Sequence, residues 1–170
     1  MKWKLSRSAA ENARAQLPKL VAHYFEAGRK ASAKGKTPKQ LHRFRIETKR
    51  FRYALELFRP VYGPTLEHHL AALRGIQNAL GKVSDYQTIE EMVAGDTVLE
   101  AKLKKSRSRK VKEFRDEWKK FDSGGQLRRW KAFLTEIDQA GKPARTKAQQ
   151  RKKATAPAEN QRDAPDPMLE

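Results

Sequence analysis

Residues 40–63 read QLHRFRIETKRFRYALELFRPVYG, and this stretch carries two periodic patterns side by side. The first is an apolar series with one threonine, spaced at alternating steps of three and four: Leu41, Phe44, Thr48, Phe51, Leu55 and Phe58. This spacing is typical of the buried seam of an α-helix. The second series lies one position further along and is polar: His42, Arg45, Lys49, Arg52 and Glu56. At about 100° per residue, it forms a ridge directly beside the seam.

The chemistry of this polar ridge predicts an anion site. Arg45 and Arg52 offer planar guanidinium groups for bidentate contacts with phosphate, and Lys49 places a point charge between them. His42 can donate hydrogen bonds from both ring nitrogens once it is protonated. Glu56 is expected to hold Arg52 in one rotamer. The alternative is that these side chains form an ordinary solvated helix face.

The helix that carries the ridge is predicted to span about 38–60. Thr37 provides an N-cap, Pro38 a proline at the first helical position and Gln40 a glutamine at the third, which together favour a helix start. Pro60 and the Gly63-Pro64 pair are expected to end the helix. Tyr53 is expected either to add its hydroxyl to the site or to fill the wall of a bundle.

The ridge also resembles a known family. The spacing HxxRxxxKxxRYxxE resembles the signature helix of the CHAD domain family, and LRGIQNALGKVSD at residues 73–85 is similar to the next element of that family. The resemblance covers residues 40–93. It implies a helical bundle that binds inorganic polyphosphate without catalysis, with two four-helix halves and a motif helix in each. This chain shows one motif helix.

Residues after the ridge contribute further candidates. Arg74 and Lys82 flank the next predicted helix and could join a basic groove. Asp85 is expected to cap a helix or to brace an arginine of the ridge. His23, His68 and His69 are poorly placed for a metal site, because the two adjacent histidines point about 100° apart and no clustered carboxylates or cysteines accompany them.

The rest of the chain predicts an all-α, antiparallel bundle of about four main helices within residues 1–140. A capping box at Ser8 starts the first helix, which Pro18 either kinks or divides. A basic loop is expected at 28–36. Further helices are expected at 65–80 with Gly81 as their stop, at 84–93, at 97–121 after a capping box that begins at Thr97, and after Gly124-Gly125. Residues 141–170 are expected to form a disordered basic tail.

The composition of the chain limits the classes of partner that it can be expected to bind. The 170 residues carry a net charge of +18, of which +15 falls on residues 1–140, so the folded part is expected to bind polyanions. Phosphate polymers, nucleic acids and anionic membranes all satisfy that condition. There is no cysteine, no apolar run near 18 residues, no Gly-rich phosphate loop and no catalytic constellation. We therefore expect a cytoplasmic protein that can associate with polyphosphate or polymer granules. It is expected to bind no membrane, to have no cofactor or metal, and not to be an enzyme.

Two alternatives and one assembly state stay open at this point. A non-specific nucleic-acid-binding protein would use the same basic surface, and a bundle that only mediates assembly, for example on granules, would carry it incidentally. A homodimer is also expected, because the resemblance implies two motif helices. The late helices supply more aromatic residues than one small bundle needs: Phe114, Trp118, Phe121, Trp130 and Phe133.

Overall fold

The computed structural model describes residues 4–93 and 95–136. Within these ranges the chain is helical and contains no strand, which confirms the all-α class. The helices are α1 (Ala9–Ser32), α2 (Pro38–Glu56), α3 (Arg59–Tyr62), α4 (Thr65–Met92), α5 (Thr97–Phe121) and α6 (Gln126–Thr135). The predicted domain boundary at residue 140 and the predicted tail at 141–170 lie outside the described residues.

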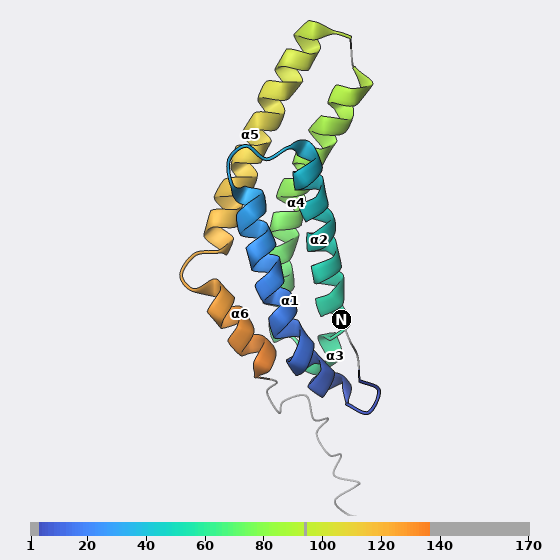
Figure 1. Ribbon diagram of the computed structural model, residues 1–170, viewed down its shortest axis with the longest axis vertical. Helices are drawn as coiled ribbons and strands as arrows, with labels where there is room; N and C mark the ends of the chain where they lie inside the picture. Colours follow the sequence, from blue (N-terminus) through green and yellow to red (C-terminus); the bar gives the residue numbers. More distant parts are fainter. Residues whose placement is uncertain (1–3, 94, 137–170) are drawn as a thin grey trace, which may run out of the picture.

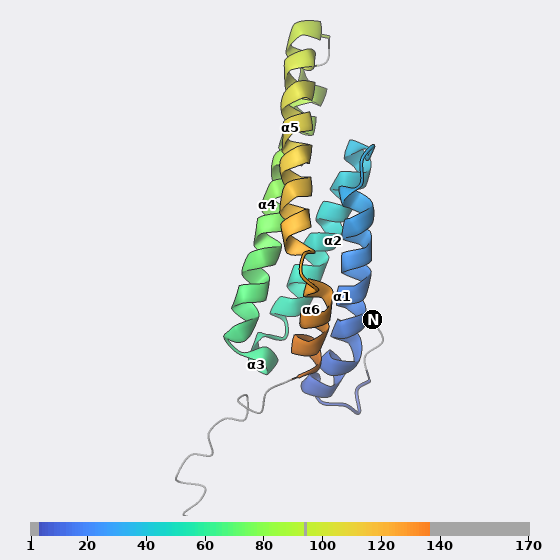
Figure 2. The ribbon, with the colours of Figure 1, turned by 90° about the vertical axis from the view of Figure 1, so that its left-hand side faces the viewer.

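The helices form an antiparallel bundle of four columns (Figure 1). Helices α1, α2 and α4 each supply one column, and α5 and α6 share the fourth, as the side view shows (Figure 2). Gly124 and Gly125 separate α5 from α6 with φ values of 60° and 76°, a region that glycine adopts without steric cost. The predicted bundle of about four main helices, some interrupted, is therefore confirmed.

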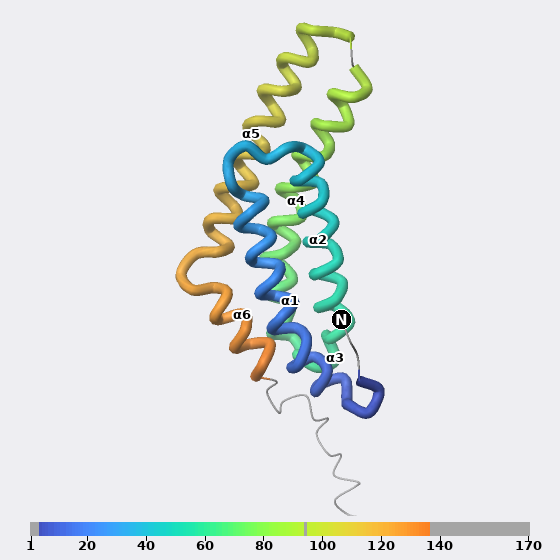
Figure 3. Tube along the Cα trace, in the orientation of Figure 1, coloured from blue at the N-terminus to red at the C-terminus, as the bar shows by residue number. Residues whose placement is uncertain are grey.

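The chain passes up and down the bundle, and one connection reaches further than the others (Figure 3). The end of α4 and the start of α5 continue past the connection between α1 and α2, so that two helices stand alone at that end (Figures 1 and 3). None of the helices in the described ranges is long and apolar enough to cross a membrane.

The predicted helix starts are mostly present. Ser8 and Thr37 each form a complete capping box, with Glu11 and Gln40 as their partners. The start of α5 differs by one residue, because its N-cap is Asp96 rather than Thr97. The Asp96 carboxylate accepts hydrogen bonds from the first free backbone N–H groups of α5, and an aspartate satisfies these as well as a threonine does.

The basic loop predicted at 28–36 is wrong in its first half, because α1 continues to Ser32. Gly28 is buried inside this helix, and a Cβ atom at this position would come within 1.9 Å of the Trp118 indole. Glycine here serves close packing between α1 and α5 rather than a turn. Helix α1 also runs through Pro18, so no second helix begins there.

The predicted stop at Gly81 and restart at Ser84 are wrong as well, because α4 is continuous from Thr65 to Met92. The buried side of α4 carries Leu73, Ile76 and Leu80 and continues into Val83 beyond the glycine. Burial of this unbroken stripe stabilises the helix by more than the propensity of about 1 kcal/mol that a single glycine costs.

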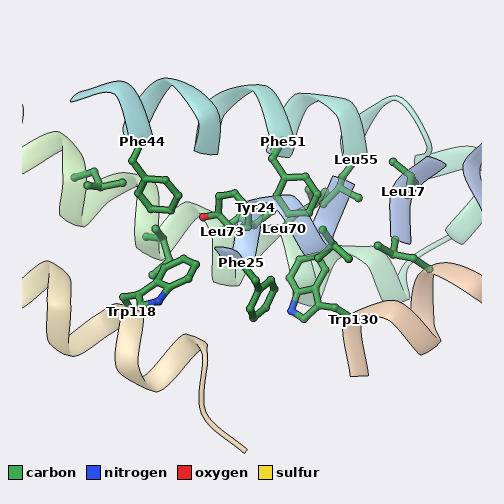
Figure 4. Close-up of a cluster of buried hydrophobic side chains, with 14 of the residues drawn as sticks. Leu17, Tyr24, Phe25, Phe44, Phe51, Leu55, Leu70, Leu73, Trp118 and Trp130 are labelled. Carbon is green, nitrogen blue, oxygen red and sulfur yellow. The ribbon is translucent and has the colours of Figure 1, made fainter. Parts of the chain in front are cut away.

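The core is an aromatic cluster around Tyr24 of α1 (Figure 4). Phe44 and Phe51 of α2 stack on the Tyr24 ring at centroid distances of 5.4 Å and 4.6 Å, and Trp118 meets it edge-on at 5.7 Å. Thr48, the polar member of the apolar seam, donates its hydroxyl to the Phe44 carbonyl oxygen at 2.9 Å. The threonine is therefore fully satisfied inside the core.

The late aromatic residues belong to this same core. Phe114, Trp118 and Trp130 are buried, and Phe121 and Phe133 pack against the core from its edge. The apolar surplus from which the sequence predicts a homodimer is thus covered by the chain itself. A homodimer needs another surface.

Candidate functional site

The polar ridge of α2 runs along the line where α2 packs against α4. From here on, we call this line of contact the seam. At one end, Nδ1 of His42 lies 3.2 Å from the Ser84 hydroxyl oxygen, and at the other, Nε of Arg52 donates to Oε1 of Gln77 at 3.0 Å. The contacts are ten residues apart along α2 and seven along α4. The first and last cations of the ridge, His42 and Arg52, therefore both touch α4, and the ridge is not a freely solvated helix face.

Arg52 is the most constrained member of the ridge. Besides its bond to Gln77, its guanidinium forms the expected ion pair with Glu56, and it lies 4.4 Å above the Tyr53 ring centroid. The Arg52 side chain is 13% exposed. With two acceptors and an aromatic face holding it, Arg52 has one fixed orientation, and some of its donors are already used.

Arg45 and Lys49 occupy the middle of the ridge and have no charge partner. Both side chains are half-buried, and neither forms an ion pair or a hydrogen bond within the described part of the chain. The Nε atom of Arg45 is buried without an acceptor. Partly buried cations that lack a carboxylate are costly unless an anion joins them, so this stretch is the most receptive part of the seam.

The α4 side of the seam is open where it lies across from Arg45 and Lys49. Gly81 lies four residues after Gln77 and three before Ser84, on the same face of α4. The register set by the two end contacts places Gly81 across from the stretch that carries Arg45 and Lys49. A Cβ atom at Gly81 would meet nothing within 4 Å, so the surface beside the two unpaired cations has room for a further group; we call this surface the groove.

Arg74 lies one turn before Gln77 on α4 and can extend the groove. Its guanidinium is 3.6 Å from the Glu67 carboxylate, which also pairs with Arg59 at 2.8 Å. One carboxylate therefore serves two arginines, and a positive charge remains at this end of the seam.

Lys82 is not brought to the ridge. It acts on Glu113 of α5, whose carboxyl pKa is lowered first by a hydrogen bond from Lys110 and more weakly by the charge of Lys82. Lys82 therefore belongs to the side of α4 that faces α5. The prediction that it joins a basic groove with the ridge has no support in this arrangement.

Two further predicted residues have changed surroundings. Tyr53 is 49% exposed, so it does not fill the wall of the bundle, and its ring supports Arg52. Asp85 cannot cap a helix, because it lies inside the continuous α4. It is exposed and has no ion pair or hydrogen bond within the described ranges, so it does not brace an arginine of the ridge either.

Two neutral residues of α4 position the ridge, and neither was predicted from the sequence. Gln77 and Ser84 are seven residues apart, which is about two helical turns, so a shared face could have been inferred from their spacing. The expected break at Gly81 hid that relation, because it assigned the two residues to different helices.

His69, which is not a member of the ridge, packs against α6. His69 stacks on Phe133 of α6 at 4.1 Å, and burial lowers its pKa. Within the described ranges no group of three or more His, Cys, Asp or Glu side chains could hold a metal ion.

Comparison with known proteins gives one match. The sequence model of the family described as "CHAD domain" matches residues 2–94, which is more than half of the chain and includes α1, α2, α3 and α4. Neither the curated proteins nor the solved structures yielded a match.

Proposed function

This chain belongs to the CHAD domain family, and we propose that it binds inorganic polyphosphate without catalysis. Domains of this family are associated with polyphosphate and triphosphate as ligands or substrates. The proposed site is the groove between α2 and α4, with Arg45 and Lys49 as its centre. His42 and Arg52 form the two ends, and Arg74 extends the groove along α4.

The observation that carries this proposal is the pair of cations without a carboxylate. Arg45 and Lys49 are half-buried and unpaired beside the open face of Gly81, whereas Arg52 next to them has its own carboxylate. A phosphate group placed here would supply the missing acceptor for Arg45 and the missing counter-charge for Lys49. Arg45 and Lys49 could bind this phosphate without any rearrangement of the helices.

The shape of the groove favours a thin polymer over a duplex. The cationic part of the ridge, from His42 to Arg52, rises over ten residues, or about 15 Å along the helix axis, and is one residue wide. A polyphosphate chain carries a negative charge on every phosphate unit and can lie along such a line. Duplex DNA presents its phosphates on a broad curved surface, which a seam between two helices follows over a short length only.

The test is a competition experiment. Fluorescently labelled long-chain polyphosphate is bound to the protein, and unlabelled polyphosphate, triphosphate and duplex DNA are added at equal phosphate concentration. We expect long-chain polyphosphate to displace the label at a much lower concentration than DNA. Both affinities should decrease with salt, because each contact releases counterions.

The alternatives predict different results. Equal displacement by DNA and polyphosphate would indicate a non-specific polyanion-binding protein that uses its whole basic surface. No binding of either polymer at physiological salt would favour a bundle that only mediates assembly.

A further inference from the structure

A second basic site lies where the connection between α1 and α2 meets the middle of α5. A cleft with a volume of about 220 Å³ opens there, and we call it the α5 cleft. Its basic lining residues are Lys36 of the connection and Arg107 and Arg115 of α5. None of the ridge residues of α2 lines it, so the α5 cleft is separate from the groove.

Two of these three cations lack a counter-charge. Arg107 is paired with Glu90 at 2.5 Å, whereas neither Lys36 nor Arg115 forms an ion pair within the described part of the chain. Arg115 donates from Nη2 to the Ala33 carbonyl oxygen at 3.3 Å, and its Nε atom is buried without an acceptor. Both unpaired side chains are half-buried, which makes the missing counter-charge costly. An anion in the cleft would remove this cost.

The inner side of the α5 cleft is apolar. It is lined by Pro38 and Leu41 of α2, Val83 of α4 and Val111 of α5. Leu41 and Val83 are buried, while Pro38 and Val111 are half-buried and supply the accessible part of this surface. A bare inorganic anion would leave that part in contact with water, whereas an apolar group attached to the anion would cover it. The lining therefore suits a ligand with a charged head and an apolar body.

We propose that the α5 cleft binds a small phosphate monoester whose organic part is apolar. A phosphate monoester carries a charge of about −1.5 to −2 at pH 7, which matches the two unbalanced cations, whereas a carboxylate balances one of them. Arg115 offers a planar fork for two phosphate oxygens, and Lys36 adds a point charge. The cleft is smaller than the pockets of about 300–1,000 Å³ that hold drug-sized ligands, so the organic part is small.

The end of the groove and the α5 cleft face different directions, although they use neighbouring residues. Leu41 and Val83 line the cleft, and each precedes a member of the His42–Ser84 contact at the end of the groove. Side chains of adjacent residues on a helix point about 100° apart. Loss of one site should therefore leave the other intact, and the two sites can be tested separately.

An NMR titration of the full chain with phenyl phosphate tests the proposal. Backbone amide signals of Gly35, Lys36 and Val111, which line the cleft, should shift together and saturate. Affinity for phenyl phosphate should exceed that for inorganic phosphate, which lacks the apolar part, and for benzoate, which carries one charge, by about fivefold. Phenol, which has no charge, should not bind. Equal affinity for phenyl phosphate and inorganic phosphate would contradict the apolar part of the proposal.

Substitutions that each remove one positive charge locate the ligand. Lys36→Gln and Arg115→Gln should each weaken phenyl phosphate binding about tenfold, because each removes a charge-assisted contact. Lys34→Gln and Lys112→Gln are matched controls, since both lysines are exposed and neither lines the cleft. They should change the affinity by less than about twofold. Equal losses in all four variants would show that only the net charge attracts the ligand, and would overturn the proposal.

Two further measurements keep the cleft apart from the groove and from effects on folding. Arg45→Ala combined with Lys49→Ala should leave phenyl phosphate binding unchanged, and amide shifts confined to α2 and α4 around these residues would place the ligand in the groove and overturn the proposal. Arg115→Gln loses the hydrogen bond to Ala33, so a thermal melt accompanies this variant. Lys36 has no partner to lose within the described ranges, so an unchanged affinity of Lys36→Gln contradicts the proposal even where Arg115→Gln does not fold.

Discussion

The ridge of α2 and the basic run of α5 at residues 102–112 carry cations in very different settings. The run is the denser of the two, with seven Lys and Arg and no acidic residue among them. Two of its cations are nevertheless paired, Arg107 with Glu90 at 2.5 Å and Lys110 with Glu113 at 2.8 Å. The others are exposed: Lys102, Lys104, Lys105, Arg109 and Lys112. In the ridge, Arg45 and Lys49 are half-buried and unpaired.

This difference shows why charge density alone does not make a site. An exposed lysine is well hydrated and screened by salt, and its interaction with one more anion contributes about 0–1 kcal/mol. A cation in a partly buried seam has lost some water already, and its attraction to an anion is screened less. The five exposed cations of the run raise the general positive field, whereas the two of the ridge define a position for a ligand.

Removing the two free cations should have the largest effect. A charge-assisted hydrogen bond contributes about 1.5–3 kcal/mol, so Arg45→Ala combined with Lys49→Ala should weaken polyphosphate binding by about 100-fold or more. The melting temperature should change little, because neither side chain has a partner to lose. Isothermal titration calorimetry and a thermal melt measure the two quantities.

The matched control takes two cations from the run. Lys104→Ala combined with Lys105→Ala removes the same charge from the molecule, and we expect less than about a fivefold loss in affinity. If both double variants lose affinity equally, only the net charge matters and the groove is not a site.

The second largest effect should come from closing the groove without changing any charge. Gly81→Leu places a side chain in the open space of the seam and should weaken binding about tenfold, while improved helix propensity raises stability by up to about 1 kcal/mol. Gly75→Leu is the control, since it adds the same side chain to α4 at an exposed position with nothing within 4 Å. Gly81→Leu binding like the wild type would place the ligand elsewhere.

Glycines mark where the fold could and could not be predicted from the sequence. Gly124 and Gly125 end a helix as expected, and their positive φ values are the reason. Gly28 and Gly81 lie inside helices. The residue type is the same in all four cases, and only the tertiary surroundings decide: contact with Trp118 for the first and the continuous buried stripe of α4 for the second. A local sequence pattern contains no information about either of these tertiary contacts.

The candidate site was predictable to the extent that one helix determines it. The seam and the ridge of α2 follow from a single periodicity, and the Arg52–Glu56 pair follows from their spacing of four. Which residues of α4 face the ridge depends on how the two helices pack, and for that reason Gln77 and Ser84 were missed and Lys82 was included. The unpaired state of Lys49 likewise depends on every neighbouring column.

A smaller effect on binding, with a clear effect on stability, is expected for Arg52→Ala. This arginine is already held by Gln77 and Glu56, so its loss removes one end of the groove and leaves two partly buried acceptors without a donor. Polyphosphate binding should weaken about fivefold, and the free energy of unfolding should decrease by about 1–3 kcal/mol. Chemical denaturation measures the second value. An unchanged stability would show that Arg52 is free and available to the ligand like Lys49.

The smallest effect should come from His42, and it should appear as a pH dependence. Contact with a polyanion favours the protonated form of an imidazole, and a protonated imidazole at the end of the ridge adds one positive charge and one donor. Binding of polyphosphate should therefore strengthen about threefold between pH 8 and pH 6, and His42→Gln should remove most of this change while keeping a hydrogen bond to Ser84 possible.

The other histidines allow this assignment to be checked. Burial lowers the pKa of His69, which makes its imidazole a weaker candidate for the added charge. His23 lies on α1 and His68 near the start of α4, and both are exposed, so His23→Gln and His68→Gln are matched controls that should retain the wild-type pH dependence. If all three glutamine variants flatten the dependence equally, the protonation acts through the net charge of the protein. If His42→Gln alone flattens it, the end of the groove beside Ser84 is in contact with the polymer.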